Sequence, residues 1–329
     1  MYFIKKLLYS ESYVRNHAEG LQGENGKMLK SLLENPIYYG IVGLGKILPD
    51  TTAANKMYLK MLFHNRMGKK LNLKNPATYN EKLQWMKLYL RNPEYTTLVD
   101  KEAVKQIVAE RVGWGYIIPT LGVWKRFEEI DFDKLPDQFV LKCNHDSGGL
   151  VICKDKSTLD LERANQKICH CMKRNYYSYS REWPYQNVPR KILAEQYISN
   201  SDGSVPEDYK FFCFNGEPDC VMVCVGRESG HTKFFFYDMN WNRRLYQKPG
   251  IEPDENITIE KPENFEAMIE VARKLAKGYP EVRVDLYNVD GKIYFGEYTF
   301  FNQSGFDSDI SLETDLYWGK QFRLEQSKS

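Results

Sequence analysis

An arginine and two acids near the C-terminus have the types and spacing of a phosphate and metal site. Arg283 and Asp285 stand two residues apart in one apolar stretch, and Glu297 and Thr299 stand two apart in the next. Side chains two apart share a strand face, so each pair can point into one cleft. Carboxylates supply hard ligands for Mg²⁺, and a guanidinium neutralises phosphoryl oxygens. The pattern indicates Mg²⁺ on a polyphosphate, although a surface hairpin with ordinary ion pairs explains it equally well.

The segment between the two pairs predicts that their strands are neighbours. Asn288-Val-Asp290-Gly291 ends in Asp-Gly, a favoured hairpin turn. A hairpin there places the two apolar stretches side by side.

A lysine and a glycine-rich loop form a second group of candidates. Lys142 ends the apolar run that begins at Phe139, and Ser147-Gly148-Gly149 follow shortly after. Glycines allow backbone N–H groups to approach phosphate oxygens, and the lysine adds positive charge. The segment is not a Walker A motif, because no Lys-Ser or Lys-Thr follows the glycines. A tight hairpin turn accounts for it just as well.

Three further segments carry candidate nucleotide contacts. Lys105 lies on a predicted helix that precedes the strands. A predicted strand ends at Glu195-Gln196-Tyr197-Ile198, before the polar linker 199–206. Backbone groups of such an extended segment can hold adenine. A strand followed by a linker without any ligand is the simpler explanation of this segment. Asp208 and Lys210 are two residues apart and share a strand face, so both can face one ligand. The acid can accept from ribose hydroxyls, and the lysine can bind the terminal phosphate.

Composition predicts a globular, reduced, cytoplasmic protein. The 329 residues are 42% hydrophobic and carry a formal charge of +2, which gives no signature of nucleic-acid binding. Seven cysteines lack a Cys-x-x-Cys pair, and several lie in apolar runs such as Cys220–Cys224, typical of packing cysteines. No run is long and apolar enough to cross a bilayer. Lys56–Lys74 mixes basic and apolar residues, which fits a membrane surface or an acidic partner, although a solvated helix explains it as well.

The order of the predicted elements indicates an α+β or α/β fold. Residues 1–75 and 76–112 have helical patterns, and strands dominate from residue 135 onward, interrupted by helices near 158–175 and 264–277. A short strand is also predicted within 116–124.

The motifs, taken in order, resemble the ATP-grasp superfamily, and most of all its TupA-like (teichuronopeptide biosynthesis) branch. The resemblance covers roughly residues 70–322 and rests on the following segments: Tyr79–Tyr89, Asp100-Lys101, Ile118-Pro119, Leu135–Lys142, Ser147-Gly148, Ala194-Glu195, Asp208–Lys210 and Gly296–Phe300. It implies two α+β lobes that clamp ATP between antiparallel sheets. The implied division is a helical N-terminal extension (1–75), an N-terminal lobe (76–135), a central ATP-grasp lobe (136–199) and a C-terminal lobe with the Mg²⁺ and phosphate site (200–329).

The resemblance also implies roles for the candidate residues. Lys105 and Lys142 are the two phosphate-binding lysines, the 143–149 loop covers the phosphates, and Glu195–Ile198 is the adenine hinge. The remaining implied roles are ribose or adenine contact for Asp208, transferred-phosphate contact for Arg283, and Mg²⁺ binding for Asp285 and Glu297. Thr299 stands where relatives carry a metal-binding asparagine, so it is a weak ligand and a second Mg²⁺ is in doubt. Asn302 is a substitute only if the strand ends before it.

The function implied is an ATP-dependent carboxylate–amine ligase that joins an amino acid and a sugar (uronic) acid in surface polysaccharide biosynthesis through an acyl phosphate. Two other enzymes stay open: a phosphotransferase acting on a sugar hydroxyl, and a glycosyltransferase, for which Asp131-Phe-Asp133 and Asp307-Ser-Asp309 match a metal-binding Asp-x-Asp pattern. A nucleotide-gated scaffold is the non-enzyme alternative. We expect no nucleic-acid partner, and we expect residues 1–75 to dock on the inner membrane surface or on a polysaccharide-assembly partner.

Overall fold

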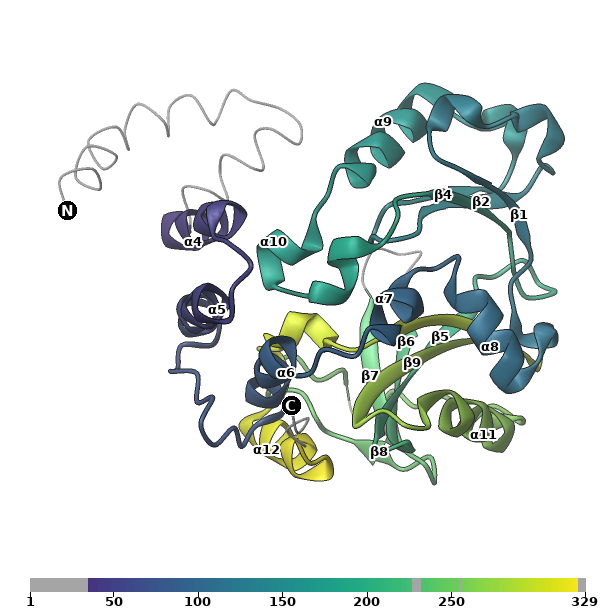
Figure 1. Cartoon of the computed structure of the whole chain (residues 1–329). Helices are drawn as coiled ribbons and strands as arrows, with labels where there is room; N and C mark the ends of the chain where they lie inside the picture. The colour runs from purple at the N-terminus through teal and green to yellow at the C-terminus, as the bar shows by residue number, and fades with distance from the viewer. Residues whose placement is uncertain (1–34, 227–231, 255, 325–329) are drawn as a thin grey trace, which may run out of the picture. The chain divides into compact units, whose positions relative to one another are not determined.

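The computed structural model describes residues 35–226, 232–254 and 256–324, and the chain divides into two compact units, Met1–Lys70 and Leu71–Ser329 (Figure 1). The first unit contains α4 (Pro36–Ile47) and α5 (Thr52–Met67). Asn35 and Thr51 cap the two helices, and Gly68 ends α5 in the left-handed conformation. A turn at Pro49 separates the two helices, and the part of the predicted helical extension before residue 35 lies outside the described residues.

Three helices open the second unit: α6 (Tyr79–Tyr89), α7 (Glu94–Val99) and α8 (Val104–Val112). A capping box fixes the start of α6, because Thr78 accepts from the Glu81 amide and Glu81 accepts from the Thr78 amide. The helix is almost entirely buried, so its polar residues bond within the protein.

A four-stranded antiparallel sheet follows, in the order β1-β4-β2-β3. Its strands are β1 (Thr120–Trp124), β2 (Phe139–Cys143), β3 (Leu150–Cys153) and β4 (Ile192–Gln196). One face packs on α9 (Leu161–Met172) through a core that includes Phe139, Leu141 and Ile168. Because β1 pairs with β4, the sheet begins before residue 135, and the predicted lobe boundary at 135/136 would divide it.

A six-stranded antiparallel sheet has the order β10-β9-β5-β6-β7-β8. Its strands are β5 (Glu207–Phe214), β6 (Glu217–Val225), β7 (Lys233–Asp238), β8 (Arg243–Arg244), β9 (Glu281–Val289) and β10 (Lys292–Thr299). α11 (Phe265–Ala276) covers one face, where Phe265 stacks on Phe211. α12 (Leu312–Gln321) covers part of the other face, where Trp318 stacks on Phe212 with ring centroids 4.6 Å apart.

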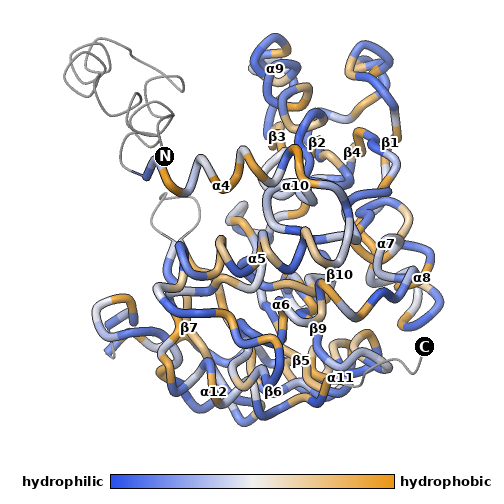
Figure 2. Tube along the Cα trace, turned by 60° about the vertical axis from the view of Figure 1, so that its left-hand side comes forward, coloured by the Kyte–Doolittle hydropathy of each residue, from blue (hydrophilic) through white to orange (hydrophobic). Residues whose placement is uncertain are grey.

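Figures 1 and 2 show the two sheets one above the other, with α9 and α11 on their outer sides. The facing sides of the sheets therefore hold the candidate site. The predicted α+β architecture of antiparallel sheets and helices is confirmed.

Short helices and loops complete the second unit. They are α10 (Tyr176–Ser180) and the 3-10 turns η2 (Trp114–Tyr116), η3 (Phe127–Glu129), η4 (Phe132–Lys134), η5 (Lys156–Thr158), η6 (Trp183–Asn187) and η8 (Asn302–Gly305). Within the part of the chain that the structure describes, no helix has both the length and the apolar character to cross a membrane.

Candidate active site

A guanidinium, an ammonium and a carboxylate meet on the open part of the six-stranded sheet. Lys210 on β5 lies directly opposite Asp285 on β9, and the two form an ion pair. Arg283, two residues earlier on β9, donates to the same carboxylate from both Nε and Nη2, at 2.7 and 2.9 Å. All three side chains are buried or nearly so, which strengthens their electrostatic coupling. The structure thus brings together the predicted residues of the two strands.

A β-bulge places Glu297 on the same face as Asp285. Residues Lys292 to Phe295 pair regularly with β9, and the register shifts between Phe295 and Glu297. Without this shift Glu297 would oppose Val284 and point to the other face, because a one-residue slip reverses every later side chain. With it, Glu297 opposes Asp285. Gly296 occupies the bulge, where a Cβ atom would lie only 3.1 Å from the Asp285 carbonyl oxygen.

Asp208 belongs to the same cluster. Its carboxylate lies 2.8 Å from the Lys210 ammonium, and its side chain is buried. Burial alone would lower the pKa of Lys210, but Asp285 and then Asp208 outweigh it and raise that pKa above its ordinary value. Lys210 therefore remains a cation, held between two carboxylates.

Neighbouring opposite charges also set the protonation states of Arg283 and Glu297. Burial works against the charged form of Arg283, yet Asp285 raises the pKa of the guanidinium further above its ordinary range. Burial works likewise against ionised Glu297, but Lys101 and then Lys210 outweigh it and lower its pKa to about 2. Lys210 and Arg283 are therefore cations and Glu297 is an anion at neutral pH.

Thr299 and Asn302 position the Arg283 guanidinium. Thr299 Oγ1 accepts from Arg283 Nη2 at 3.0 Å, and Asn302 Oδ1 accepts from Arg283 Nη1 at 2.6 Å. The amide of Asn302 donates to Asp307, so both ends of that side chain are engaged. β10 ends at Thr299, and Asn302 lies in the following turn. Both residues thus orient the arginine in this structure.

The donor set fits one Mg²⁺ ion. Asp285 and Glu297 lie directly opposite one another and offer hard oxygen ligands on one face. Among the described residues, no group of three or more His, Cys, Asp or Glu side chains is placed to hold a metal. An ion here would therefore complete its coordination with phosphate and water oxygens, as Mg²⁺ often does.

Two lysines share one glutamate on the four-stranded sheet. Lys105 reaches Glu195 from α8 at 2.7 Å, and Lys142 reaches it from β2. Lys105 also donates to the carbonyl of Ile118 at 2.8 Å. Burial would raise the pKa of Glu195, but Lys142 and Lys105 outweigh it and lower the pKa. The predicted phosphate lysines thus lie together, with Glu195 holding their ammonium groups.

The same face of this sheet carries exposed apolar side chains. Val123 pairs with Leu193, Ile152 with Val140, and Leu150 with Lys142, so all share the face opposite α9. Val123, Leu150 and Ile152 are exposed. Exposed apolar side chains beside two lysines provide a surface for a flat ring attached to phosphates.

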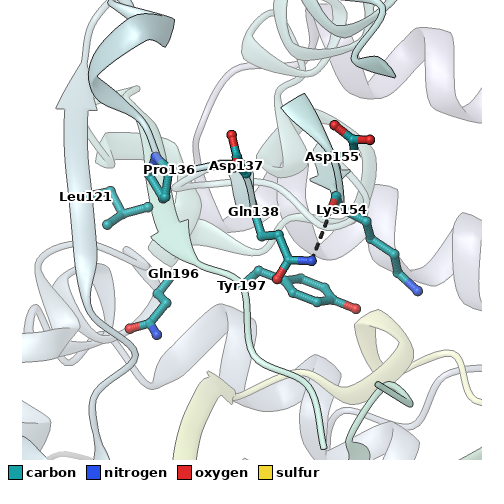
Figure 3. A pocket seen from close by; sticks show the side chains of 8 residues that line it. All are labelled: Leu121, Pro136, Asp137, Gln138, Lys154, Asp155, Gln196 and Tyr197. Atoms are coloured by element: carbon teal, nitrogen blue, oxygen red, sulfur yellow. Dashed lines mark hydrogen bonds between the residues drawn. The ribbon is translucent and has the colours of Figure 1, made fainter. Parts of the chain in front are cut away.

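The predicted hinge lies at the edge of a groove. The Gln196 amide donates to the Pro119 carbonyl at 3.0 Å, Tyr197 follows it, and partly buried Ile198 continues into the linker. Gln196 and Tyr197 border a groove of about 800 Å³, and Figure 3 shows the side chains that line it. The groove is lined by Leu121, Pro136, Asp137, Gln138, Lys154, Asp155, Gln196 and Tyr197. It reaches neither the lysine pair nor the acids of the other sheet.

The predicted phosphate loop is held at both ends. The Gly149 carbonyl accepts from the Cys143 amide at 2.9 Å, and the Tyr176 hydroxyl bonds to the Ser147 backbone, accepting from its N–H and donating to its carbonyl. Gly148 has a φ of +92°, a conformation that favours glycine. A Cβ atom on Gly149 would lie 2.7 Å from the Cβ atom of Cys171, so larger residues do not fit there.

Lys101 connects this loop to the other sheet, a role that the sequence analysis missed. Its ammonium lies 3.1 Å from Glu297 and donates to the Asp146 carbonyl at 3.1 Å. Its amide donates to the Asn144 carbonyl at 3.0 Å. The only sequence signal was its place in the Asp100-Lys101 motif.

Tyr185 and Tyr176 are two further residues that the sequence did not single out. Their ring centroids lie 5.5 Å apart, and Tyr176 contacts the phosphate loop. Burial raises the pKa of Tyr185 well above its ordinary value, with Glu182 and Glu297 contributing in turn. The two rings therefore border the space near Glu297.

The two antiparallel sheets, with lysines on one and the acid–arginine cluster on the other, define an ATP-grasp fold. A profile of the family described as TupA-like ATPgrasp matches residues 81–323, and this chain belongs to that family. No curated protein matches the chain.

Several solved structures resemble the chain. The D-alanine–D-alanine ligase of Bacillus anthracis complexed with ATP is 18% identical over 69% of this chain and 68% of its own, with a TM-score of 0.38. The L-amino acid ligase of Bacillus licheniformis is 16% identical over 69% and 49%, with a TM-score of 0.40. The N5-carboxyaminoimidazole synthetase of Staphylococcus aureus complexed with ADP is 11% identical over 84% and 65%, also with a TM-score of 0.40. The chain spans about half to two thirds of the length of these proteins.

Proposed function

We propose that this chain is an ATP- and Mg²⁺-dependent carboxylate–amine ligase. The observation that carries the proposal is the placement of cations on both sheets. Lys105 and Lys142 lie on one side, Lys210 and Arg283 on the other, and Lys101 contacts both the 143–149 loop and Glu297. This spacing of positive groups suits a triphosphate that runs from one sheet to the other.

We infer that the adenine ring binds against the apolar face of the four-stranded sheet, near the hinge. Its phosphates then lie under the 143–149 loop, next to Lys105 and Lys142. The terminal phosphate reaches Lys210 and Arg283, whose charges are fixed by Asp285 before ATP arrives. Such pre-positioned cations lower the energy of a phosphoryl transfer without rearrangement.

The chemistry we propose has two steps. A carboxylate oxygen of the substrate attacks the terminal phosphorus, the bond to the bridging oxygen breaks, and ADP leaves. The nitrogen lone pair of an amine then attacks the acyl carbon, the bond from that carbon to the phosphate oxygen breaks, and the nitrogen releases a proton to solvent. Arg283 and Lys210 stabilise the phosphoryl oxygens throughout. Asp285 and Glu297 would hold Mg²⁺, which when bound neutralises charge on the phosphates.

The acidity of the cluster favours a carboxylate acceptor over a hydroxyl. A hydroxyl nucleophile needs a general base with a pKa near neutrality. Lys101 helps to hold the pKa of Glu297 at about 2, and Asp285 is bound by two cations. Glu297 is therefore a poor base, and Asp285 is occupied by the two cations, whereas a carboxylate substrate is already ionised and needs no base. This argues against the phosphotransferase.

The contacts made by the two Asp-x-Asp segments argue against a metal site of a glycosyltransferase. Asp131 caps η4 and pairs with Lys134 at the surface, at 2.8 Å. The Asp307 carboxylate accepts from the Asn302 side-chain amide and from the Asp309 backbone, so its contacts lie within its own segment of the chain. Both segments thus have structural partners.

For the substrates, we propose a sugar acid and an amino acid, joined in surface polysaccharide biosynthesis in the cytoplasm. Family membership supports the pathway. The rings of Tyr176 and Tyr185 support a sugar, because aromatic rings pack well on the apolar faces of sugar rings.

Product analysis tests the proposal. The full chain is incubated with ATP, Mg²⁺, pooled uronic acids and pooled amino acids, and in parallel with hydroxylamine in place of the amino acids. We expect ADP and phosphate only with the acceptors present, together with an amide or a hydroxamate by mass spectrometry. A phosphorylated sugar without any amide would select the phosphotransferase instead. Glu313→Gln, an exposed carboxylate on α12, is the control variant and should leave the products unchanged.

A further inference from the structure

The charge of the chain is divided unequally between its two units. Residues 1–70 hold 11 of the 46 Lys and Arg residues and 5 of the 44 Asp and Glu residues, a net charge of +6. The remaining 35 basic and 39 acidic residues leave the second unit at −4. The described residues of the first unit, 35–70, include six basic residues and one acid. This asymmetry indicates an anionic partner for the first unit.

α5 presents a face on which lysines and methionines alternate. The exposed side chains recur at helical spacing: Lys56, Met57, Lys60, Met61 and His64. Met57 is 46% exposed and Met61 is 39% exposed. The opposite face is apolar and buried, and it consists of Tyr58, Leu59, Leu62 and Phe63. The methionines are therefore additional to the side chains that the helix uses for packing.

α4 exposes apolar side chains at both ends. Ile37 is 68% exposed and Ile47 is 79% exposed, and Lys46 lies in the last turn. In Figure 2, orange hydrophobic turns recur along this helix. Single exposed apolar residues are ordinary, but two helices of one small unit share this feature.

We propose that the outer face of α5, together with the exposed isoleucines of α4, docks the protein on an anionic lipid surface. A lysine extends its apolar stem beside neighbouring apolar groups and keeps its ammonium near lipid phosphates. Methionines between such lysines then enter the boundary between headgroups and acyl chains. A protein partner would need acids placed to match these lysines, whereas an anionic leaflet accepts any such arrangement.

Vesicle flotation of the full chain tests this docking. We expect binding to phosphatidylcholine vesicles that contain one third phosphatidylglycerol, weak binding to pure phosphatidylcholine, and loss at high salt. Because each basic residue near the surface contributes roughly a fivefold factor, Lys56→Gln/Lys60→Gln should weaken partitioning roughly 25-fold. Met57→Ser/Met61→Ser leaves the charge unchanged, and it should also weaken the binding to vesicles.

A matched variant controls for net charge. Lys125→Gln/Lys320→Gln removes two exposed lysines from the second unit and should bind vesicles like the wild-type chain. Circular dichroism establishes that each variant is folded. Equal binding of the wild-type and the Lys56/Lys60 variant would overturn the proposal, and so would equal binding to neutral vesicles. A dimer in sedimentation that dissociates on Met57→Ser/Met61→Ser, without vesicle binding, would assign the face to a second copy instead.

Discussion

The Lys101 ammonium lies 3.1 Å from the Glu297 carboxylate, although the two residues belong to different parts of the candidate site. Lys101 precedes α8 and also contacts the 143–149 loop, whereas Glu297 lies on β10 of the six-stranded sheet. One cation therefore joins the loop expected to cover the phosphates to the acid expected to hold Mg²⁺.

Replacing this cation should impair ATP use. Lys101→Gln removes the charge that most lowers the pKa of Glu297 and loosens the loop. We expect kcat/KM for ATP to fall about 10- to 100-fold, on the order of 1.4–2.8 kcal/mol of transition-state stabilisation. Steady-state kinetics measures this, and Lys261→Gln, which breaks an exposed pair with Glu266, should stay close to wild type. Unchanged kinetics in Lys101→Gln would show that Lys101 has no part in ATP use.

The two acids should both be required for turnover, but they should differ in their effect on stability. Glu297→Gln and Asp285→Asn should each lower ATP turnover by orders of magnitude. Asp285→Asn also leaves Arg283 and Lys210 buried without their shared counter-charge, which costs about 3 kcal/mol or more. Glu297 is partly exposed, so Glu297→Gln should unfold close to wild type. Near-wild-type turnover in both variants would place the metal site elsewhere.

Asn302 should act by orienting Arg283. Asn302→Ala removes the oxygen that accepts from Arg283 Nη1, so the guanidinium loses one fixed contact. We expect kcat to fall about tenfold, a change on the order of 1.4 kcal/mol. The increase in Tm caused by ATP should persist, since the lysine pair on the other sheet is unchanged. Asn256→Ala, at an exposed position, is the control and should leave kcat unchanged. If Asn302→Ala abolishes nucleotide binding but not folding, the residue binds ATP directly.

A buried acid two residues before Arg283 on β9 should make stability depend on pH. Glu281 is fully buried and accepts from the Tyr79 hydroxyl at 2.7 Å, and burial raises its pKa from 4.5 to about 8. The folded state then holds a proton that the unfolded state releases above about pH 4.5. Its contribution to stability is full below that pH and is lost as the pH rises to about 8, a change on the order of 5 kcal/mol.

Glu281→Gln isolates this effect, because it keeps the shape and an acceptor for Tyr79 but does not titrate. Urea unfolding across this pH range should show the variant gaining stability relative to wild type as the pH rises. A constant difference between the two proteins would contradict the raised pKa.

Much of the site on the six-stranded sheet was predictable from local patterns. The Asp290-Gly291 turn and the two-residue spacing of Arg283 and Asp285 indicated the hairpin and its polar face, and both residues of the turn have positive φ. The position of Glu297 was not determined by spacing. A regular hairpin would have turned it away, and only the bulge at Gly296 brings it opposite Asp285.

Long-range contacts set the limit of the sequence analysis. Lys101, Tyr176 and Tyr185 reach the site through tertiary packing, and no periodicity marks them. The carboxylate of Glu195 lay in the predicted adenine hinge, but it holds Lys105 and Lys142, a pairing between three separate elements. The boundary at 135/136 divided a sheet for the same reason, since β1 joins β4 only in space.

Thermal denaturation with a panel of nucleotides tests whether the chain binds ATP, which we place between the two sheets. ATP and ADP with Mg²⁺ should raise the Tm of the full chain, because a ligand that binds only the folded state stabilises it. UDP and UDP-sugars should have little effect, and Lys142→Met should lose the increase caused by ATP while remaining folded. Stabilisation by UDP-sugars, with none by millimolar ATP or ADP, would contradict the account.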